Sequence, residues 1–199
     1  MQPKIPNPPT IQGLHHYAYR AKDAEETRHF YEDILGLPLY HIIQSDHVPS
    51  TGEYCPYTHF FFRLGDGSYI AFFDLGDDEA ALPSPNTPAW VNHIAISVPT
   101  LADLTAMKTR LEAHGIDVIG VTDHHVFKSI YFFDPNGVRL ELSYQIASAQ
   151  AMQKESIVAR QRLDEWTARK NQWRTERAAH PSSVDKLKPQ QNDRPELNH

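Results

Sequence analysis

The chain has 199 residues, a length that suits one compact domain or two small fused modules. A formal net charge of -6 and the absence of a basic cluster in the central part of the sequence argue against a nucleic-acid-binding protein. The single cysteine, Cys55, fits a reducing cytosol, and the polar, Pro-rich first residues do not resemble a signal peptide. No apolar run approaches the roughly 20 residues that span a bilayer, so we expect a cytoplasmic protein without a membrane partner.

The first half of the sequence predicts a βαβββ unit at residues 11–81, after a Pro-rich arm at 1–10. Asp23 is expected to cap a helix, with Glu26 completing a capping box, and Gly36 is expected to end it. The predicted elements are, in chain order, a strand at 13–20, this helix to about residue 35, a strand around 39–44, a polar loop at about 45–56, and a hairpin that pairs 59–64 with 69–73.

The second half predicts the same order of elements at residues 90–147, after a Pro-rich linker at 82–89. Thr100 and Asp103 are expected to cap a helix that ends at Gly115. The predicted elements are a strand at 91–98, the helix at 101–114, a strand around 116–121, and strands at 128–133 and 138–144 joined by the turn Asp134-Pro-Asn-Gly137.

The two halves agree in their turn residues as well as in their order of elements. Laying one half on the other pairs His16 with His93, and it pairs the helix-ending Gly36 with Gly115. A repeat of this kind is typical of a duplicated structural unit. The sequence therefore predicts an α+β fold built from two tandem βαβββ modules.

The composition changes after the second module, where residues 148–178 have high helix propensity. Met152, Ala159, Trp166 and Trp173 are spaced seven apart, so they form one apolar stripe on an otherwise charged helix. Such a stripe usually packs on a domain or on a partner subunit, and we therefore expect a homodimer. The segment 179–199 holds three prolines and few apolar groups, which predicts a disordered or draped tail.

The hairpin at residues 131–143 carries one carboxylate in an apolar setting. Glu141 alternates with Leu140 and Leu142, so its side chain points to the opposite face of the strand. If that face lines the inside of a curved sheet, burial of the carboxylate requires a cation or hydrogen-bond donors. The alternative is an exposed glutamate on the solvent side of a half-buried strand.

Three stretches of this sequence resemble the vicinal oxygen chelate superfamily, which includes glyoxalases, type I extradiol dioxygenases, fosfomycin-resistance enzymes and bleomycin-binding proteins. These stretches are residues 13–23 running into Phe30–Leu37, residues 92–98 with the run Asn-His-Ile-Ala-Ile-Ser-Val, and residues 131–142 with the turn Asp-Pro-Asn-Gly followed by Leu-Glu. The resemblance implies that the two modules form a cup-shaped mixed sheet around a divalent metal ion.

By position, the resemblance implies that His16, His93 and Glu141 are the metal ligands. The place of a fourth ligand, which glyoxalase I fills, holds Ala71 here, so four-ligand glyoxalase chemistry is not favoured. Two imidazoles and one carboxylate on one face of a metal form the facial triad of non-haem Fe(II) oxygenases, and Mn(II) or Zn(II) tolerate similar sets. Either histidine alone would more simply be interpreted as an ordinary core residue.

Other side chains are weaker candidates for the site. Tyr131 stands where extradiol dioxygenases carry a tyrosine near the substrate ring, but it is equally well explained as a core residue. His124 and His125 could act as a general acid or base near neutral pH, or they could be solvated loop histidines. His59 could face either side of its sheet, and Lys128 could meet an anionic substrate group or lie on the surface. An aromatic wall is suggested by Tyr57, Phe61, Phe72 and Phe73.

The combined pattern predicts a metal-dependent enzyme that acts on a small organic molecule. The three-ligand set with Ala71 and the aromatic content favour an extradiol ring-cleaving dioxygenase of catechol-type substrates that uses Fe(II). The first alternative is a non-redox lyase, isomerase or transferase with Mn(II) or Zn(II). The second alternative is a small-molecule binding or resistance protein without catalysis.

Overall fold

The computed structural model describes residues 10–179, and the chain divides into two units. The first unit comprises the chain up to Pro83 together with the turn Asp134–Val138, and the second comprises Ser84–Phe133 and the chain from Arg139 onward. The predicted arm, apart from residue 10, and the predicted tail, apart from residue 179, lie outside the described residues. Within residues 10–179, no helix is both long enough and apolar enough to cross a membrane.

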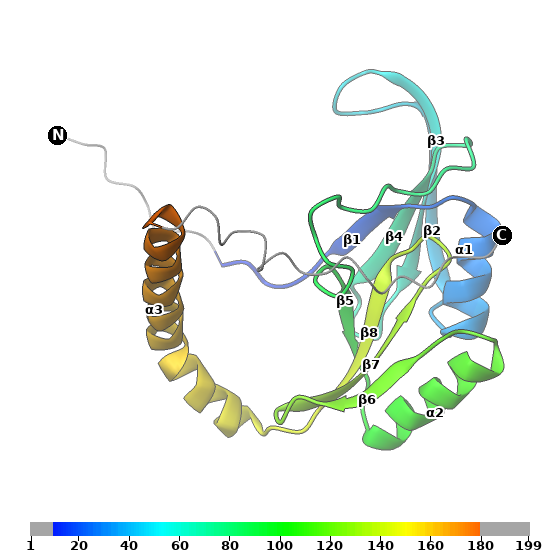
Figure 1. The fold of residues 1–199 in the computed structure, drawn as a ribbon. Helices are drawn as coiled ribbons and strands as arrows, with labels where there is room; N and C mark the ends of the chain where they lie inside the picture. The colour runs from blue at the N-terminus through cyan, green and yellow to red at the C-terminus, as the bar shows by residue number, and fades with distance from the viewer. Residues whose placement is uncertain (1–9, 180–199) are drawn as a thin grey trace. The chain divides into compact units, whose positions relative to one another are not determined.

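The first unit is a four-stranded sheet with one helical segment against it (Figure 1). The strand order is β1-β4-β3-β2, in which β1 and β4 are parallel and the other neighbours are antiparallel. Its elements are β1 (His16–Arg20), α1 (Ala24–Arg28), η1 (His29–Ile34), β2 (Leu39–His47), β3 (Tyr54–Arg63) and β4 (Tyr69–Asp74).

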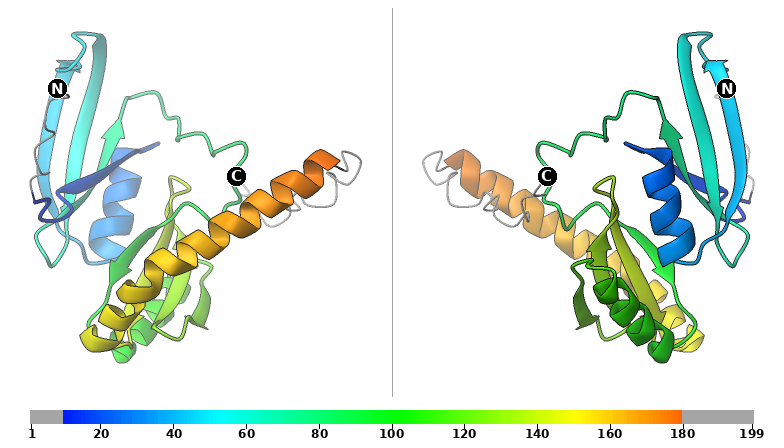
Figure 2. Two further views of the ribbon diagram at one scale, coloured as in Figure 1. Left: turned by 90° about the vertical axis from the view of Figure 1, so that its left-hand side faces the viewer. Right: turned by 90° about the vertical axis from the view of Figure 1, so that its right-hand side faces the viewer.

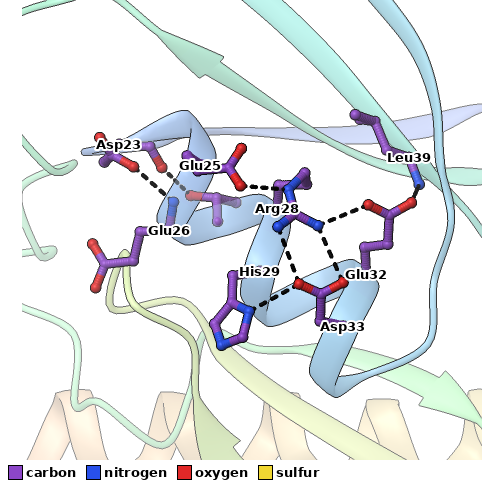
Figure 3. Close-up of polar contacts among 9 residues, drawn as sticks. Asp23, Glu25, Glu26, Arg28, His29, Glu32, Asp33 and Leu39 are labelled. Atoms are coloured by element: carbon purple, nitrogen blue, oxygen red, sulfur yellow. Dashed lines mark hydrogen bonds and ion pairs between the residues drawn. The ribbon is translucent and has the colours of Figure 1, made fainter.

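The helix of the first unit begins at the predicted cap but changes its hydrogen bonding half-way. Asp23 accepts a hydrogen bond from the backbone N–H of Glu26 at 2.7 Å, and Gly36 ends the helix with φ of 77°. From His29 onward the helix is a π-helix rather than the expected α-helix. Arg28 pairs with Asp33 five residues further on as well as with Glu25 and Glu32, and the i,i+5 pair matches the π-helical spacing (Figure 3).

The hairpin of β2 and β3 is longer than the sequence predicted. The polar loop expected at about 45–56 is shortened, because β2 continues to His47 and β3 already begins at Tyr54. The register of the pair shifts between Ser45 and His47, opposite the part of β3 that contains Pro56. A bulge at this point accommodates a residue that has no N–H for the ladder, which is why the Pro/Gly composition misled the prediction.

The second unit repeats the same sheet topology. The strand order is β5-β8-β7-β6, again with one parallel pair, β5 with β8. Its elements are β5 (Ile94–Ser97), α2 (Leu101–Ala113), β6 (Ile119–Asp123), β7 (Phe127–Phe133), β8 (Arg139–Gln145) and α3 (Ala149–Ala179). Thr100 caps α2 by accepting from the N–H of Asp103 at 3.1 Å. Strand β5 is shorter than predicted and begins after His93, and β6 lies a few residues later than predicted.

The registers of the two sheets confirm the predicted duplication at the level of single residues. Ala18 of β1 is opposite Ala71 of β4, and Ala95 of β5 is opposite Glu141 of β8. Because Ala18 and Ala95 each lie two residues after the paired histidines, Ala71 occupies the position that Glu141 occupies in the second sheet. The fold class predicted from the sequence is therefore the one observed.

The core of the first unit is aromatic and includes the turn between β7 and β8. Tyr31 is fully buried and stacks on Phe62 with ring centroids 5.1 Å apart. Its hydroxyl donates to Asp134 Oδ2 at 2.9 Å. Asn136 donates to Thr27 Oγ1 at 3.0 Å. The Asp-Pro-Asn-Gly segment is thus fixed by side-chain hydrogen bonds to the first unit as well as by its own turn.

Helix α3 is one continuous helix (Figure 2). Its described side chains are all at least partly exposed. Trp166 and Trp173 of the predicted stripe contact each other edge-to-face, with ring centroids 5.5 Å apart. Leu163 and Met152 remain largely exposed. The stripe is therefore at least partly exposed, and its packing on a partner subunit stays a prediction.

Candidate functional site

The second unit brings two of the three predicted ligands into direct contact. Glu141 lies in the middle of β8 and is 3% exposed. Its Oε2 is 3.0 Å from Nε2 of His93, whose side chain is 32% exposed. His93 precedes β5, and β5 is hydrogen-bonded to β8, so the sheet itself positions the pair. The buried alternative for Glu141 is the one observed.

The other carboxylate oxygen of Glu141 is held by three hydroxyl groups. Ser129, Ser143 at 2.8 Å and Tyr131 at 3.2 Å all donate to Oε1. Burial alone would raise the pKa of Glu141, but these three hydrogen bonds and the charge of His93 lower it below its usual value. The carboxylate is therefore stabilised in its ionised form.

The contacts of His93 indicate what belongs between the two ligands. Nδ1 of His93 is 3.0 Å from the carbonyl oxygen of Val91, so the ring donates through Nδ1, and its Nε2 faces Glu141. An imidazole nitrogen 3.0 Å from a carboxylate oxygen holds a cation between them, either a proton or a metal ion. Ligands bound at about 2.1 Å and at right angles are about 3 Å apart. The spacing of the pair therefore fits one edge of a metal coordination sphere.

Tyr131 and His124, which the sequence proposed for catalysis, contact each other beside Glu141. The Tyr131 hydroxyl is 2.7 Å from His124 Nε2, and the ring of Tyr131 lies under the guanidinium of Arg139 at 4.3 Å. Burial, and then the charge of Glu141, raise the pKa of Tyr131. A chain of groups that can exchange a proton thus runs from His124 through Tyr131 to Glu141.

His125 and Lys128 have other contacts. The backbone N–H of His125 donates to Asp123 Oδ1 at 2.7 Å, and His125 is exposed with φ of 68°. Lys128 pairs with the same carboxylate at 3.1 Å. Both residues therefore stabilise the β6–β7 turn, and among residues 10–179 the polar contacts of Glu141 are made by Ser129, Tyr131, Ser143 and His93 instead.

In the first unit, His16 and His59 lie on the same face of the sheet. Their ring centroids are 5.9 Å apart. His59 is buried, its Nδ1 is 2.9 Å from the carbonyl oxygen of Phe72, and its ring stacks on Phe73 at 3.7 Å. Burial is the main reason that the pKa of His59 is lowered, so the imidazole is neutral. The sequence left its orientation open, and the structure places it beside His16.

His15 contacts its neighbour His16. The Nδ1 atoms of the two rings are 2.7 Å apart. β1 begins at His16, so His15 before it is free of the alternation of strand side chains. The contact uses Nδ1 of His16 and leaves its Nε2 uninvolved.

The predicted aromatic wall is only partly present. Phe61, Phe73 and Tyr57 lie on the face that carries His59, with the Tyr57 and Phe73 rings 5.4 Å apart. Phe72 points to the opposite face and packs against Tyr31. Adjacent residues of a strand alternate between faces, and the sequence prediction did not separate the two.

Ser129 and Ser143 are the site residues that sequence reasoning missed. They are register partners on β7 and β8, and their hydroxyls are 2.9 Å apart. The signal for Ser143 was present, since it lies two residues after Glu141 on the same strand and so shares its face. Recognising Ser129 required the register between β7 and β8.

The full three-ligand set stays a prediction. His16 belongs to the first unit, and His93 and Glu141 belong to the second. Among residues 10–179, no three His, Cys, Asp or Glu side chains form a group that could hold a metal ion. Of the three predicted ligands, His93 and Glu141 are the two that contact each other.

Comparison with known proteins places the sheets in a family. A family model described as Glyoxalase/Bleomycin resistance protein/Dioxygenase superfamily matches residues 13–142. A glyoxalase/bleomycin resistance protein/dioxygenase domain from Frankia sp. EAN1pec is 18% identical, with a TM-score of 0.56 over 68% of this chain and 99% of that chain. A glyoxalase/dioxygenase from Nostoc punctiforme is 24% identical, with a TM-score of 0.51 over 72% and 98%.

A third similar structure contains a metal ion. The fosfomycin resistance protein FosX from Listeria monocytogenes, complexed with Mn(II) and sulfate, is 21% identical, with a TM-score of 0.50. The similarity covers 72% of this chain and 98% of that chain. At these identities the three solved structures establish a shared fold.

Proposed function

Because the chain belongs to the Glyoxalase/Bleomycin resistance protein/Dioxygenase superfamily, we propose that it is a metal-dependent enzyme that acts on a small organic molecule. The proposed ligands of one divalent cation are His93 and Glu141, with His16 assigned from the sequence resemblance. The observation that carries the proposal is the 3.0 Å contact between His93 Nε2 and Glu141 Oε2, in which an imidazole nitrogen faces a buried carboxylate.

The residues around this pair fit a bound cation. Glu141 is ionised, its Oε1 is occupied by hydroxyl donors, and its Oε2 is left to face His93. The Nδ1–H of His93 donates to a backbone carbonyl, which orients the ring as a metal ligand requires. The chemistry that the cation would supply is acidification of a bound hydroxyl and, for Fe(II), reactivity with O₂.

Among the reactions of the superfamily, we propose extradiol ring cleavage of a catechol-type substrate with Fe(II). His59 is a neutral imidazole whose Nε2 can accept a proton from a substrate hydroxyl, because its Nδ1 is bonded to Phe72. Tyr131 and His124 form a second proton-exchanging pair next to Glu141. Phe61 and Phe73 offer aromatic surfaces beside His59 against which a planar ring can pack.

A second candidate is a non-redox lyase, isomerase or transferase with Mn(II) or Zn(II). A histidine and a carboxylate suit these ions as well as Fe(II), and the proton-exchanging pair would serve proton transfer in an isomerase equally well. A protein that binds a small molecule without catalysis is the third candidate, and it does not explain the buried, ionised Glu141.

Oxygen uptake tests the proposed reaction. The protein is loaded with Fe(II) without oxygen and mixed with aerobic solutions of a panel of catechols, and a ring-cleaving dioxygenase consumes one O₂ for each ring opened. Glu141→Gln should abolish the uptake, and His125→Ala, which alters an exposed histidine nearby, should leave it unchanged. If the Fe(II)-loaded protein takes up no oxygen but turns over a substrate with Mn(II) or Zn(II), the non-redox lyase, isomerase or transferase is favoured.

We also propose that the protein is a homodimer that buries the stripe of α3. Trp166 is 48% exposed and Leu163 is 55% exposed. This is a large exposed apolar area for an otherwise charged helix. Light scattering of the full chain measures the mass directly.

A further inference from the structure

The first unit contains a cavity of about 350 Å³ next to His59. This volume lies within the range of small-molecule sites. Its walls come from the β2–β3 loop, from β3 and from the end of β4. The lining residues are Val48, Pro49, Ser50, Cys55, Tyr57, His59, Phe73 and Leu75.

The cavity continues the face of the sheet that carries His16. Cys55, Tyr57 and His59 are alternate residues of β3 and therefore share one face. At about 3.3 Å per residue, Cys55 lies about 13 Å along the strand from His59. His59 is next to His16, the proposed metal ligand of this unit. A molecule bound at His16 could therefore extend past His59 into the cavity.

The lining selects for uncharged groups. None of the eight residues is an aspartate, glutamate, lysine or arginine. Val48, Pro49, Phe73 and Leu75 provide apolar surface, so an anionic group would lose its hydration without gaining a cationic partner. An alkyl or aryl group would bury surface at about 25 cal/mol per Å².

The repeat shows how the wall of this cavity differs from the second unit. Val48, Pro49 and Ser50 line the cavity and belong to the segment that joins β2 to β3, residues 48–53. The corresponding connection in the second unit, between β6 and β7, is only residues 124–126. The shorter connection offers fewer residues for such a wall.

We infer that this cavity binds the uncharged alkyl or aryl substituent of the substrate, and that Leu75 and Val48 determine which substituents are accepted. The inference rests on the proposed function, because it takes the substrate ring to be held at the His16 and His59 end. It narrows the substrate class to ring compounds with an apolar substituent, and it disfavours carboxylated rings.

Cys55 is the only cysteine of the chain and lines the cavity, so its thiol reports on occupancy without any turnover. The rate of its alkylation by neutral iodoacetamide is measured without oxygen, in the presence of catechol, 4-tert-butylcatechol or 3,4-dihydroxybenzoate. We expect 4-tert-butylcatechol to slow labelling at least fivefold, and the other two compounds less than twofold. Equal protection by the carboxylated ring, or protection by none of the three, would overturn the inference.

Filling the cavity provides the second arm of the test. Leu75→Trp, or Val48→Phe if the first variant folds poorly, should weaken binding of 4-tert-butylcatechol at least tenfold and leave catechol unchanged. The matched control is Leu82→Trp, at a position that is 93% exposed and outside the cavity. If Leu75→Trp still consumes catechol and its preference between catechol and 4-tert-butylcatechol is unchanged, the cavity assignment alone is refuted. Selective protection of Cys55 in a protein that opens no ring would refute the proposed reaction alone.

Discussion

The two sheets have the same topology, but the side chains at equivalent positions differ in their chemistry. At equivalent positions, the second sheet has Glu141, Tyr131 and Ser129 where the first has Ala71, Phe61 and His59. The second sheet therefore supplies a carboxylate and the hydroxyls that hold it, and the first supplies aromatic surface, a neutral imidazole and a cavity. The two copies therefore share a sheet topology and differ in the side chains that they carry at equivalent positions.

Two buried carboxylates, one in each unit, differ in the direction in which their pKa is shifted. Asp134 in the first unit accepts hydrogen bonds from Tyr31, Asn136 and Val138, yet burial raises its pKa to about 6. Glu141 in the second unit is also buried, but its hydroxyl donors and His93 lower its pKa. At Glu141 the hydroxyl donors of Ser129, Ser143 and Tyr131, and after them the charge of His93, outweigh burial, whereas at Asp134 burial outweighs the donors. Asp134 fits a role in structure, and Glu141 fits a role that needs a negative charge.

The largest expected effect comes from removing that charge. Glu141→Gln keeps the shape of the side chain and its hydroxyl neighbours but offers a neutral oxygen to the cation. We expect affinity for the divalent ion to fall by more than about 100-fold, since loss of outer groups alone costs 10–100-fold. Isothermal titration of metal-free protein measures the affinity. Unchanged affinity would show that the buried carboxylate is not a ligand.

Tyr131→Phe separates a catalytic role from a core role. The variant keeps the ring under Arg139 and removes the hydroxyl that contacts His124 and Glu141. We expect turnover to fall by about 100-fold, as for loss of a general acid or base, with metal affinity changed little. Tyr54→Phe, at a 70% exposed position, is the control. Full activity in Tyr131→Phe would leave Tyr131 as a core residue only.

Asp134 should make the stability of the fold depend on pH. Its pKa is about 6 in the folded protein and about 3.9 in an unfolded chain. The folded state therefore binds more protons between these values, so stability falls as pH rises from about 4 to about 6 and is constant above that range. At roughly 1.4 kcal/mol per pKa unit, the loss is about 1–3 kcal/mol.

The difference between wild type and Asp134→Asn isolates this contribution, because the other titrating groups are common to both proteins. We expect the variant to become more stable relative to wild type as the pH is raised from 4 to 7. Denaturant unfolding at a series of pH values measures it. A difference in unfolding free energy that does not change with pH would contradict the raised pKa of Asp134.

The smallest expected effect on folding is at α3. Trp166→Glu should convert a dimer to a monomer and change the unfolding free energy of the monomer by less than about 0.5 kcal/mol, because the side chain is half exposed. Ile157→Glu is the matched control, since Ile157 is 73% exposed and lies off the seven-residue stripe. A wild-type monomer, or a dimer that survives Trp166→Glu, would exclude α3 as the interface.

Local signals in the sequence predicted the fold well. Asp23 and Thr100 cap their helices as expected, and the Gly36 and Gly115 positions end them with positive φ. The features that escaped prediction depend on partners far apart in the sequence. The length of the β2–β3 hairpin depends on a bulge opposite Pro56, and the hydroxyl cluster around Glu141 depends on the register of β7 with β8. Local propensity does not encode either of these.

The candidate site was predictable to the same extent. His93 and Glu141 were proposed from the resemblance and are in contact, and Tyr131 contacts His124, while the roles of all four residues stay predictions. His125 was proposed on the same grounds as His124 but lies on the turn, because adjacent residues after a strand end diverge. The orientation of His59 required its contact with Phe72.

Metal analysis of the full chain, purified without chelators and without oxygen, tests the central claim most directly. The account predicts about one divalent ion per chain in the wild type and in His125→Ala, and none in Glu141→Gln or His93→Ala. A wild-type protein that remains metal-free when Fe(II), Mn(II) or Zn(II) is supplied, or a Glu141→Gln variant that retains its metal, would contradict it.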